Sequence, residues 1–195
     1  MNQKKQRTLA IFALAIALVA TTVAYAALST TLKVSGSVTK KGGTWAINIQ
    51  NISTVTTAGS GKMTTAPKVS GTTLSFAAEL SKPGDSVSFT FDIANNGTLS
   101  AIMVWDYVRM SINSVNSSLA SGTEMVVKSD DIIYELALKD SSGSFNVSQW
   151  DYSLSLAPKG NQTFRLTLKY DPNASSVSAS DKALTVSATF PFTQA

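Results

Sequence analysis

The 195-residue sequence contains no cysteine and no histidine. Without cysteine, the chain cannot form a disulfide or bind zinc through thiolates. Without histidine, it lacks the most frequent general base and the most frequent zinc ligand. A metalloprotease or a catalytic triad that depends on histidine is therefore not expected. We expect no cofactor and no enzymatic activity. The 12 acidic residues do not exclude a pair of carboxylates for glycoside hydrolysis, but no particular pair is indicated.

Charged residues are scarce, at 14% of the chain, and three basic ones lie in the first seven positions. A short apolar run follows at residues 9–20, and then the small-residue sequence Ala24-Tyr25-Ala26. This order is typical of a secretory signal peptide, and the apolar run is short for a membrane span. We predict that residues 1–26 are a signal peptide cut after Ala26 by a signal peptidase, with an uncleaved anchor as the alternative.

The charge that remains after this cut is nearly balanced, with 13 basic and 12 acidic residues. It gives no argument for a nucleic-acid partner. Its distribution is uneven, because residues 27–78 contain five lysines and no acid, whereas residues 79–195 contain 12 acids and 8 bases. This asymmetry favours head-to-tail stacking of copies, unless the opposite charges simply face each other within one domain.

The mature sequence alternates repeatedly between apolar and polar residues, a period typical of β-strands with one dry face. Clear rows are Leu74, Phe76, Ala78 and Leu80; Val87, Phe89, Phe91 and Ile93; and Phe164, Leu166, Leu168 and Tyr170. Turn-forming clusters separate these rows. We predict an all-β protein, a jelly-roll or immunoglobulin-like β-sandwich that forms a single domain over residues 27–195.

The segment 101–112 differs because apolar residues lie on both of its faces. It is predicted to be a strand that is covered on both faces or whose outer face meets a ligand. Asp106 lies between Trp105 and Tyr107 in this segment. If Asp106 is buried it needs a partner such as Arg109, and if it is exposed, Trp105, Asp106 and Tyr107 form a candidate face for a sugar or polymer.

Residues 80–99 contain two turns with a strand between them, Leu80-Ser81-Lys82-Pro83-Gly84-Asp85 and Asn95-Asn96-Gly97-Thr98-Leu99. With the predicted signal peptide, which is similar to those of the SipW type, this unit resembles the TasA and camelysin-like exported proteins of Gram-positive bacteria. The residues that carry the resemblance are Lys82, Pro83, Gly84, Asp85, Phe91, Asn95, Asn96 and Gly97. The resemblance implies a jelly-roll subunit of extracellular matrix fibres, in which the segment after the cleavage site completes the sheet of the neighbouring subunit. The chain is shorter than TasA and lacks histidine for a camelysin-type peptidase, so proteolysis is not implied.

Residues 27–38 are the candidate donor strand. Leu28, Leu32, Val34 and Val38 would fill a groove, while Lys33 and Ser35 would face water. An unpaired strand edge is a template for such an added strand, and the sequence leaves open whether residues 27–38 pair within their own domain or with the next copy.

We therefore expect a secreted structural subunit of an extracellular matrix or cell-surface fibre, a head-to-tail homopolymer whose partner is itself. The alternative is a secreted monomeric module that binds cell-wall polymers or polysaccharide. Asp130-Asp131 with Ser129 offers oxygen ligands for calcium, but the spacing lacks the alternating ligands of a calcium loop. We therefore expect solvated acids there and no metal site.

Overall fold

The computed structural model describes residues 4, 7, 14–16, 42–113, 115–118, 126–147, 154–174 and 182–195, with the backbone alone at 106, 115–118, 129 and 182. The chain divides into two units, Met1–Lys41 and Gly42–Ala195. The described positions of the first unit are helical. Within the described residues, no helix combines the length and the apolar character needed to cross a membrane. The cleavage residues Ala24 and Ala26 and the candidate donor strand, with Leu28, Leu32, Val34 and Val38, lie outside the described residues.

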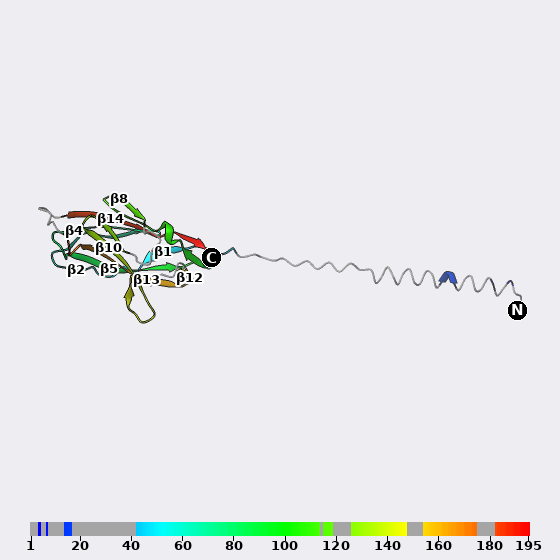
Figure 1. Ribbon diagram of the computed structural model, residues 1–195. Helices are drawn as coiled ribbons and strands as arrows, with labels where there is room; N and C mark the ends of the chain where they lie inside the picture. The colour runs from blue at the N-terminus through cyan, green and yellow to red at the C-terminus, as the bar shows by residue number, and fades with distance from the viewer. Residues whose placement is uncertain are drawn as a thin grey trace. The chain divides into compact units, whose positions relative to one another are not determined.

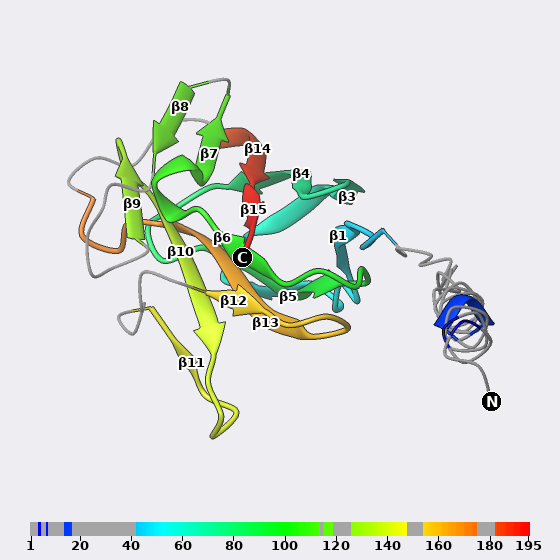
Figure 2. The same ribbon diagram turned by 90° about the vertical axis from the view of Figure 1, so that its right-hand side faces the viewer.

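The second unit is an all-β sandwich, as the alternating pattern predicts, and it forms antiparallel sheets (Figures 1 and 2). The first sheet has the strand order β1-β5-β13-β10-β11, with β2 beside β5 and β9 beside β10. Its strands are β1 (Ile47–Gln50), β2 (Thr56–Ala58), β5 (Ser86–Asn95), β9 (Val126–Ser129), β10 (Ile132–Lys139), β11 (Phe145–Asn146) and β13 (Asn161–Tyr170).

The second sheet has the order β3-β4-β14-β7-β8, and a small third sheet has the order β12-β6-β15. The strands of the second sheet are β3 (Lys62–Ser70), β4 (Thr73–Leu80), β7 (Arg109–Ile112), β8 (Val115–Ser118) and β14 (Lys182–Thr189). Those of the third are β6 (Ala101–Met103), β12 (Ser155–Leu156) and β15 (Phe192–Gln194), and the short 3-10 helix η1 (Trp105–Tyr107) separates β6 from β7.

The strand pairing is nested. β4 pairs with β14, and β5, which follows β4 in the chain, pairs with β13, which precedes β14. The chain then adds β7 beside β14 and β10 beside β13. A chain that folds back on itself and winds in this way forms a jelly roll, so of the two predicted sandwich types the pairing order favours the jelly roll.

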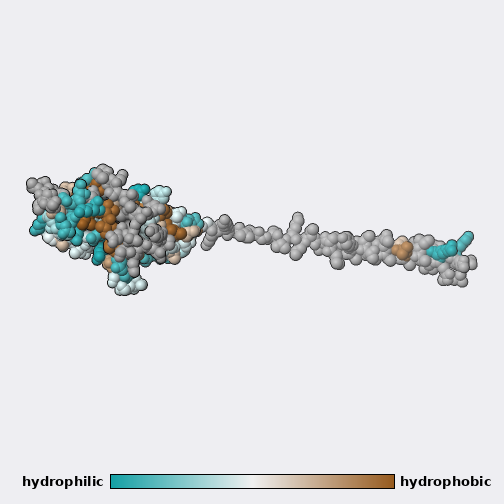
Figure 3. Space-filling view, in the orientation of Figure 1, coloured by the Kyte–Doolittle hydropathy of each residue, from teal (hydrophilic) through white to brown (hydrophobic). Residues whose placement is uncertain are grey.

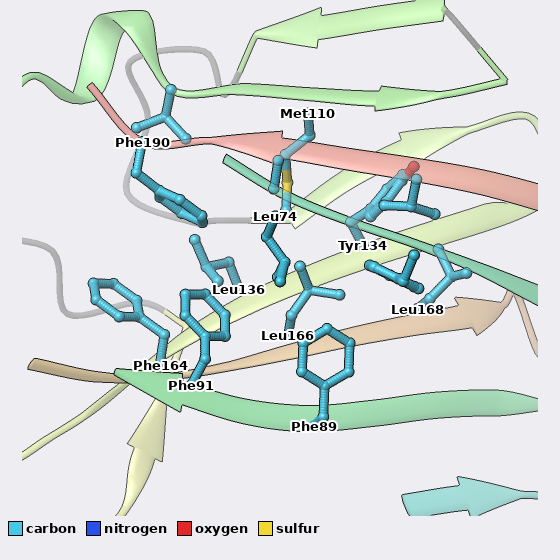
Figure 4. Close-up of a cluster of buried hydrophobic side chains, with 14 of the residues drawn as sticks. Leu74, Phe89, Phe91, Met110, Tyr134, Leu136, Phe164, Leu166, Leu168 and Phe190 are labelled. Atoms are coloured by element: carbon cyan, nitrogen blue, oxygen red, sulfur yellow. The ribbon is translucent and has the colours of Figure 1, made fainter. Parts of the chain in front are cut away.

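The core lies between the first and second sheets and uses the predicted apolar rows. Every second residue of β4, β5 and β13 is buried, from Leu74 to Leu80, Val87 to Ile93 and Phe164 to Tyr170. Figure 4 shows Phe91 and Phe164 side by side on one sheet, facing Phe190 from the other side of the core. The Phe91 and Phe164 rings stack with centroids 5.6 Å apart. Such aromatic pairs stabilise a core by about 0.5–1.5 kcal/mol beyond the area that they bury.

Tyr134 of β10 is a polar group in this core. It is buried, and its hydroxyl has no hydrogen-bond partner among the described residues. Burial raises the pKa of this phenol. We expect Tyr134→Phe to leave the free energy of unfolding unchanged or to raise it by about 1 kcal/mol, because the substitution removes an unsatisfied polar atom and keeps the ring. Urea denaturation measures the change, with the exposed Tyr107→Phe as the control. A loss of more than about 1 kcal/mol would contradict the prediction, since that is the net value of a typical hydrogen bond.

Candidate functional site

The first half of the sequence motif forms the tight turn that leads from β4 into β5. The Asp85 amide donates to the carbonyl oxygen of Lys82 at 3.1 Å. Pro83 occupies the second position of the turn, and Gly84 occupies the third with a φ of 90°. Proline fixes the negative φ that the second position needs, and glycine accepts the positive φ of the third, so this sequence specifies a type II turn.

The Asp85 side chain fastens this turn to another one. Its carboxylate is buried and accepts four hydrogen bonds of 2.9 Å, from the amide and hydroxyl of Ser60 and from the amides of Ser81 and Lys82. Ser60 belongs to the turn between β2 and β3, so one carboxylate ties the two sheets together at this end of β5. Gly59 approaches so closely that a Cβ there would lie 2.2 Å from Asp85 Oδ1.

The surroundings of Asp85 favour its charged form. Burial alone would raise the pKa of this carboxyl, but the hydrogen bonds from the amides of Ser60, Ser81 and Lys82 and from the Ser60 hydroxyl outweigh it and hold the pKa below its ordinary value of 3.8. Hydrogen bonds to a carboxylate stabilise the ionised state in this way. Asp85 is therefore a structural anion, whose charge is satisfied by the protein itself.

The second half of the motif closes the other end of β5 through Asn95. This side chain is buried, and its Nδ2 donates to the carbonyl oxygens of Leu99 at 2.7 Å and Leu156 at 3.0 Å. Its Oδ1 accepts from the Gly97 amide at 3.0 Å. One amide group thus fixes the loop after β5 and joins it to β12 of the third sheet.

The same loop holds the first residues of the sandwich. The Thr44 amide donates to Thr98 Oγ1 at 2.8 Å, the Thr98 amide donates to the Thr44 carbonyl oxygen at 2.9 Å, and the Asn96 amide donates to the Ala46 carbonyl oxygen at 2.7 Å. A Cβ on Gly97 would lie 2.3 Å from the Thr44 carbonyl oxygen. The motif therefore anchors the point where the sandwich begins.

A second proline turn leads into β13, the partner of β5. Here Gly160 donates to the Ala157 carbonyl oxygen at 2.9 Å, and Lys159 has a φ of 64°. Each turn is also bonded to the end of the opposite strand. The Gly84 amide donates to the carbonyl oxygen of Tyr170, and the backbone amide of Asn95 donates to the carbonyl oxygen of Gly160. The two turns thus share a geometry and close the two ends of one strand pair, which makes them parts of the scaffold.

The candidate ligand face of Trp105, Asp106 and Tyr107 does not lie on a strand. The predicted continuous strand over 101–112 is wrong, because η1 interrupts it between β6 and β7. The Val108 amide donates to the Trp105 carbonyl oxygen at 2.9 Å, which closes this helical turn where the chain passes from the third sheet to the second.

The two aromatic residues of this segment therefore differ in exposure. Trp105 packs against the hydrophobic core, whereas Tyr107 is 62% exposed, with the Arg109 guanidinium 5.8 Å from its ring centroid. The Asp106 side chain lies outside the described part of the chain. Of Trp105 and Tyr107, only Tyr107 is therefore exposed enough to meet a ligand. Figure 3 shows hydrophobic residues exposed among hydrophilic ones on one face of the molecule.

Asp130-Asp131 lies in the turn between β9 and β10. The Asp131 carbonyl oxygen accepts from the Asp171 amide at 2.7 Å, and the buried Asp171 carboxylate pairs with Lys128. That pairing, with the Asn173 amide, lowers the pKa of Asp171. Among the described residues, no group of three or more acidic side chains is placed to hold a metal ion. The backbone contact between Asp131 and Asp171 and the Lys128–Asp171 ion pair both hold this turn.

The sequence alone did not indicate two of these roles, those of Ser60 and Asp171. Ser60 lies 25 residues before Asp85 and has only a local signal, the glycines on either side of it in Gly59-Ser60-Gly61. Asp171 follows the last residue of β13, where an acidic residue is usually exposed. Both roles depend on contacts between turns that are distant in the sequence.

The fold and these anchors define an all-β sandwich in which the motif residues hold turns and loops together. A comparison of the chain with models of protein families, with curated proteins and with solved structures finds no match.

Proposed function

We propose that this protein is a secreted subunit of an extracellular matrix fibre and that copies join head to tail through the segment 27–38. The observation that carries the proposal is the alternation of apolar and polar residues in segment 27–38, which precedes the sandwich unit Gly42–Ala195. A segment with this pattern can pair as a strand with one apolar side. The signal-like beginning of the sequence and its resemblance to TasA support secretion and a place in the matrix.

The length of the leading segment fits this role. Residues 27–41 span up to about 50 Å when fully extended. The longest strands of the sandwich, such as β13, have 10 residues and therefore span roughly 33 Å. A leading segment that starts at Ala27 is long enough to follow a whole strand of the next subunit and still leave a short connection.

The edge strand β3 of the second sheet carries features that oppose unspecific pairing, and this favours a dedicated donor segment. In the described part of the chain, β3 pairs only with β4, so its outer side is a sheet edge. This strand contains Lys62, Pro67 and Lys68, and its register shifts twice against β4. Lysines, proline and bulges on an edge strand oppose unspecific pairing. Ordered assembly then depends on a specific segment.

Electron microscopy and sedimentation of the purified mature chain over a range of concentrations test the proposal. We expect polymers that lengthen with concentration, and only monomers after deletion of residues 27–38. The sandwich of the deletion variant should unfold at the same urea concentration as that of the full mature chain. A mature chain that stays monomeric at every concentration would refute the proposal.

Matched substitutions within the segment make the test sharper. Val34→Asp places a charge on the apolar side and should abolish the polymers, because a buried unpaired charge is strongly unfavourable. Ser35→Asp places the same charge on the side predicted to face water and should leave them intact. Equal effects of the two substitutions would show that the segment does not pair as an alternating strand.

A further inference from the structure

Asn96 and Gly97, in the loop after β5, form the dipeptide at which asparagine is chemically least stable. The backbone nitrogen of Gly97 can attack Cγ of Asn96, because glycine has no side chain to hinder the approach. A new carbon–nitrogen bond then closes a succinimide ring, and the side-chain NH2 leaves as ammonia with the proton from the Gly97 amide. Water opens the ring to aspartate or isoaspartate, so the reaction needs no co-reactant other than water.

The fold opposes each part of this reaction. The attacking nitrogen belongs to Gly97, which is buried, and its N–H donates to Asn95 Oδ1 at 3.0 Å. The Asn96 side chain is held by a 2.7 Å hydrogen bond from its Nδ2 to Asn48 Oδ1. Both backbone polar groups of Asn96 are hydrogen-bonded. Its amide donates to the carbonyl oxygen of Ala46 at 2.7 Å, and its carbonyl oxygen accepts from Lys159 Nζ at 2.5 Å.

The packing around Gly97 also prevents a substitution that would remove the labile dipeptide. The position of a Cβ on Gly97 is already occupied, with the Thr44 carbonyl oxygen 2.3 Å away and the Ala46 nitrogen 3.0 Å away. Both are backbone atoms of the segment that begins the sandwich, so they cannot move aside as a flexible side chain would. The packing requires glycine after Asn96, and the loop needs another means of protection.

We infer that the buried Asn95 side chain protects the Asn96-Gly97 bond from deamidation, and that Asn96 becomes a modification site whenever this loop opens. Asn95 engages the reacting nitrogen directly and holds the loop against Leu99 and Leu156. Deamidation of Asn96 would remove its donor to Asn48 and add a negative charge beside Lys159. The inference depends only on the sandwich and is independent of the proposed fibre.

Peptide mapping of the mature chain, incubated in warm, mildly alkaline buffer, measures aspartate and isoaspartate at position 96. We expect the folded chain to deamidate there at least about tenfold more slowly than the same chain in urea, because reaction must wait for local opening of the loop. Equal rates in the folded and unfolded chains would overturn the inference.

A variant separates the role of Asn95 from general stability. Folded Asn95→Ala should deamidate at Asn96 at least about tenfold faster than the wild type, because local opening costs less. The control is Gly59→Ala, which disturbs the opposite end of β5 and should leave the rate at Asn96 near the wild-type value. Equal acceleration in both variants would assign the protection to overall stability and refute the inference.

Hydrogen exchange of the Gly97 amide in the wild-type chain provides a second measurement should Asn95→Ala fail to fold. A protected loop predicts slow exchange at this amide, close to that of the β5 amides. Exchange as fast as in an unstructured peptide would overturn the inference without any variant.

Discussion

Asp85→Ala is expected to lower the free energy of unfolding by about 2–4 kcal/mol, because it removes a buried carboxylate and leaves four part-buried donors without their acceptor. The donors are the amides of Ser60, Ser81 and Lys82 and the Ser60 hydroxyl, which all bond to the Asp85 carboxylate at 2.9 Å. The contact between the β2–β3 turn and the β4–β5 turn is lost with them. Urea denaturation followed by tryptophan fluorescence measures the change.

Asp140→Ala is the matched control for this substitution. The Asp140 carboxylate also accepts hydrogen bonds from nearby groups, including the amides of Ser142 and Ser144 at 2.9 Å, but these bonds are exposed and lie within one hairpin loop. Water can replace the lost acceptor there, so only a small loss is expected. If both substitutions destabilise the chain to the same extent, the burial of Asp85 does not have the role that we assign to it.

The same carboxylate gives the protein an acid-sensitive anchor. The pKa of Asp85 is lower in the folded chain than its ordinary value, although burial opposes the shift, because four hydrogen bonds favour the ionised form. Its contribution is therefore complete above the ordinary pKa of 3.8, which applies to the unfolded chain, and is lost as the pH falls through the lower folded value. In Asp85→Asn, this part of the acid destabilisation should be absent, so its stability should fall less steeply below about pH 4.

Gly59→Ala is expected to cost about 3 kcal/mol, from backbone strain and from collision with the Asp85 anchor. Gly59 has a φ of 64°, where a Cβ is unfavourable, and the added atom would lie 2.2 Å from Asp85 Oδ1. Gly71→Ala is the matched control, because Gly71 has a φ of 59° but open space around its Cβ position. It should cost only the strain, about 1–2 kcal/mol.

The combination of the two substitutions at this anchor tests whether they act on one contact. The double variant with Gly59→Ala and Asp85→Ala should lose less stability than the sum of the single losses, since the alanine at 85 removes the oxygen with which the new Cβ collides. Additive losses, or equal losses for Gly59→Ala and Gly71→Ala, would show that Gly59 is required only for its backbone conformation.

The sequence predicted those parts of the fold that depend on local patterns. The alternating rows of β4, β5 and β13 became buried faces, and the turn at Pro83-Gly84 formed where proline and glycine specify it. These features depend on the preferences of neighbouring residues along the chain.

The parts that the sequence did not predict depend on long-range contacts. The interruption of segment 101–112 by η1 arises where the chain changes sheets, and such a change has no local signal. Asn95 and Leu156 are 61 residues apart, so the burial of the asparagine amide could not be inferred from its neighbours. The motif residues were recognised as turns, but their function as anchors between distant loops required the structure.

The anchorage of Thr44 also determines how the sandwich bears mechanical load. A force that pulls on the beginning of this unit reaches the loop 96–98 through the hydrogen bonds of Thr44 and Ala46 and then passes into β5. β5 is hydrogen-bonded to β13 along nearly its whole length, from Ser86 to Ala94. A load applied there is therefore divided among several hydrogen bonds, those of Thr44 and Ala46 to the loop 96–98 and those of β1 to β5, before it reaches the centre of the first sheet.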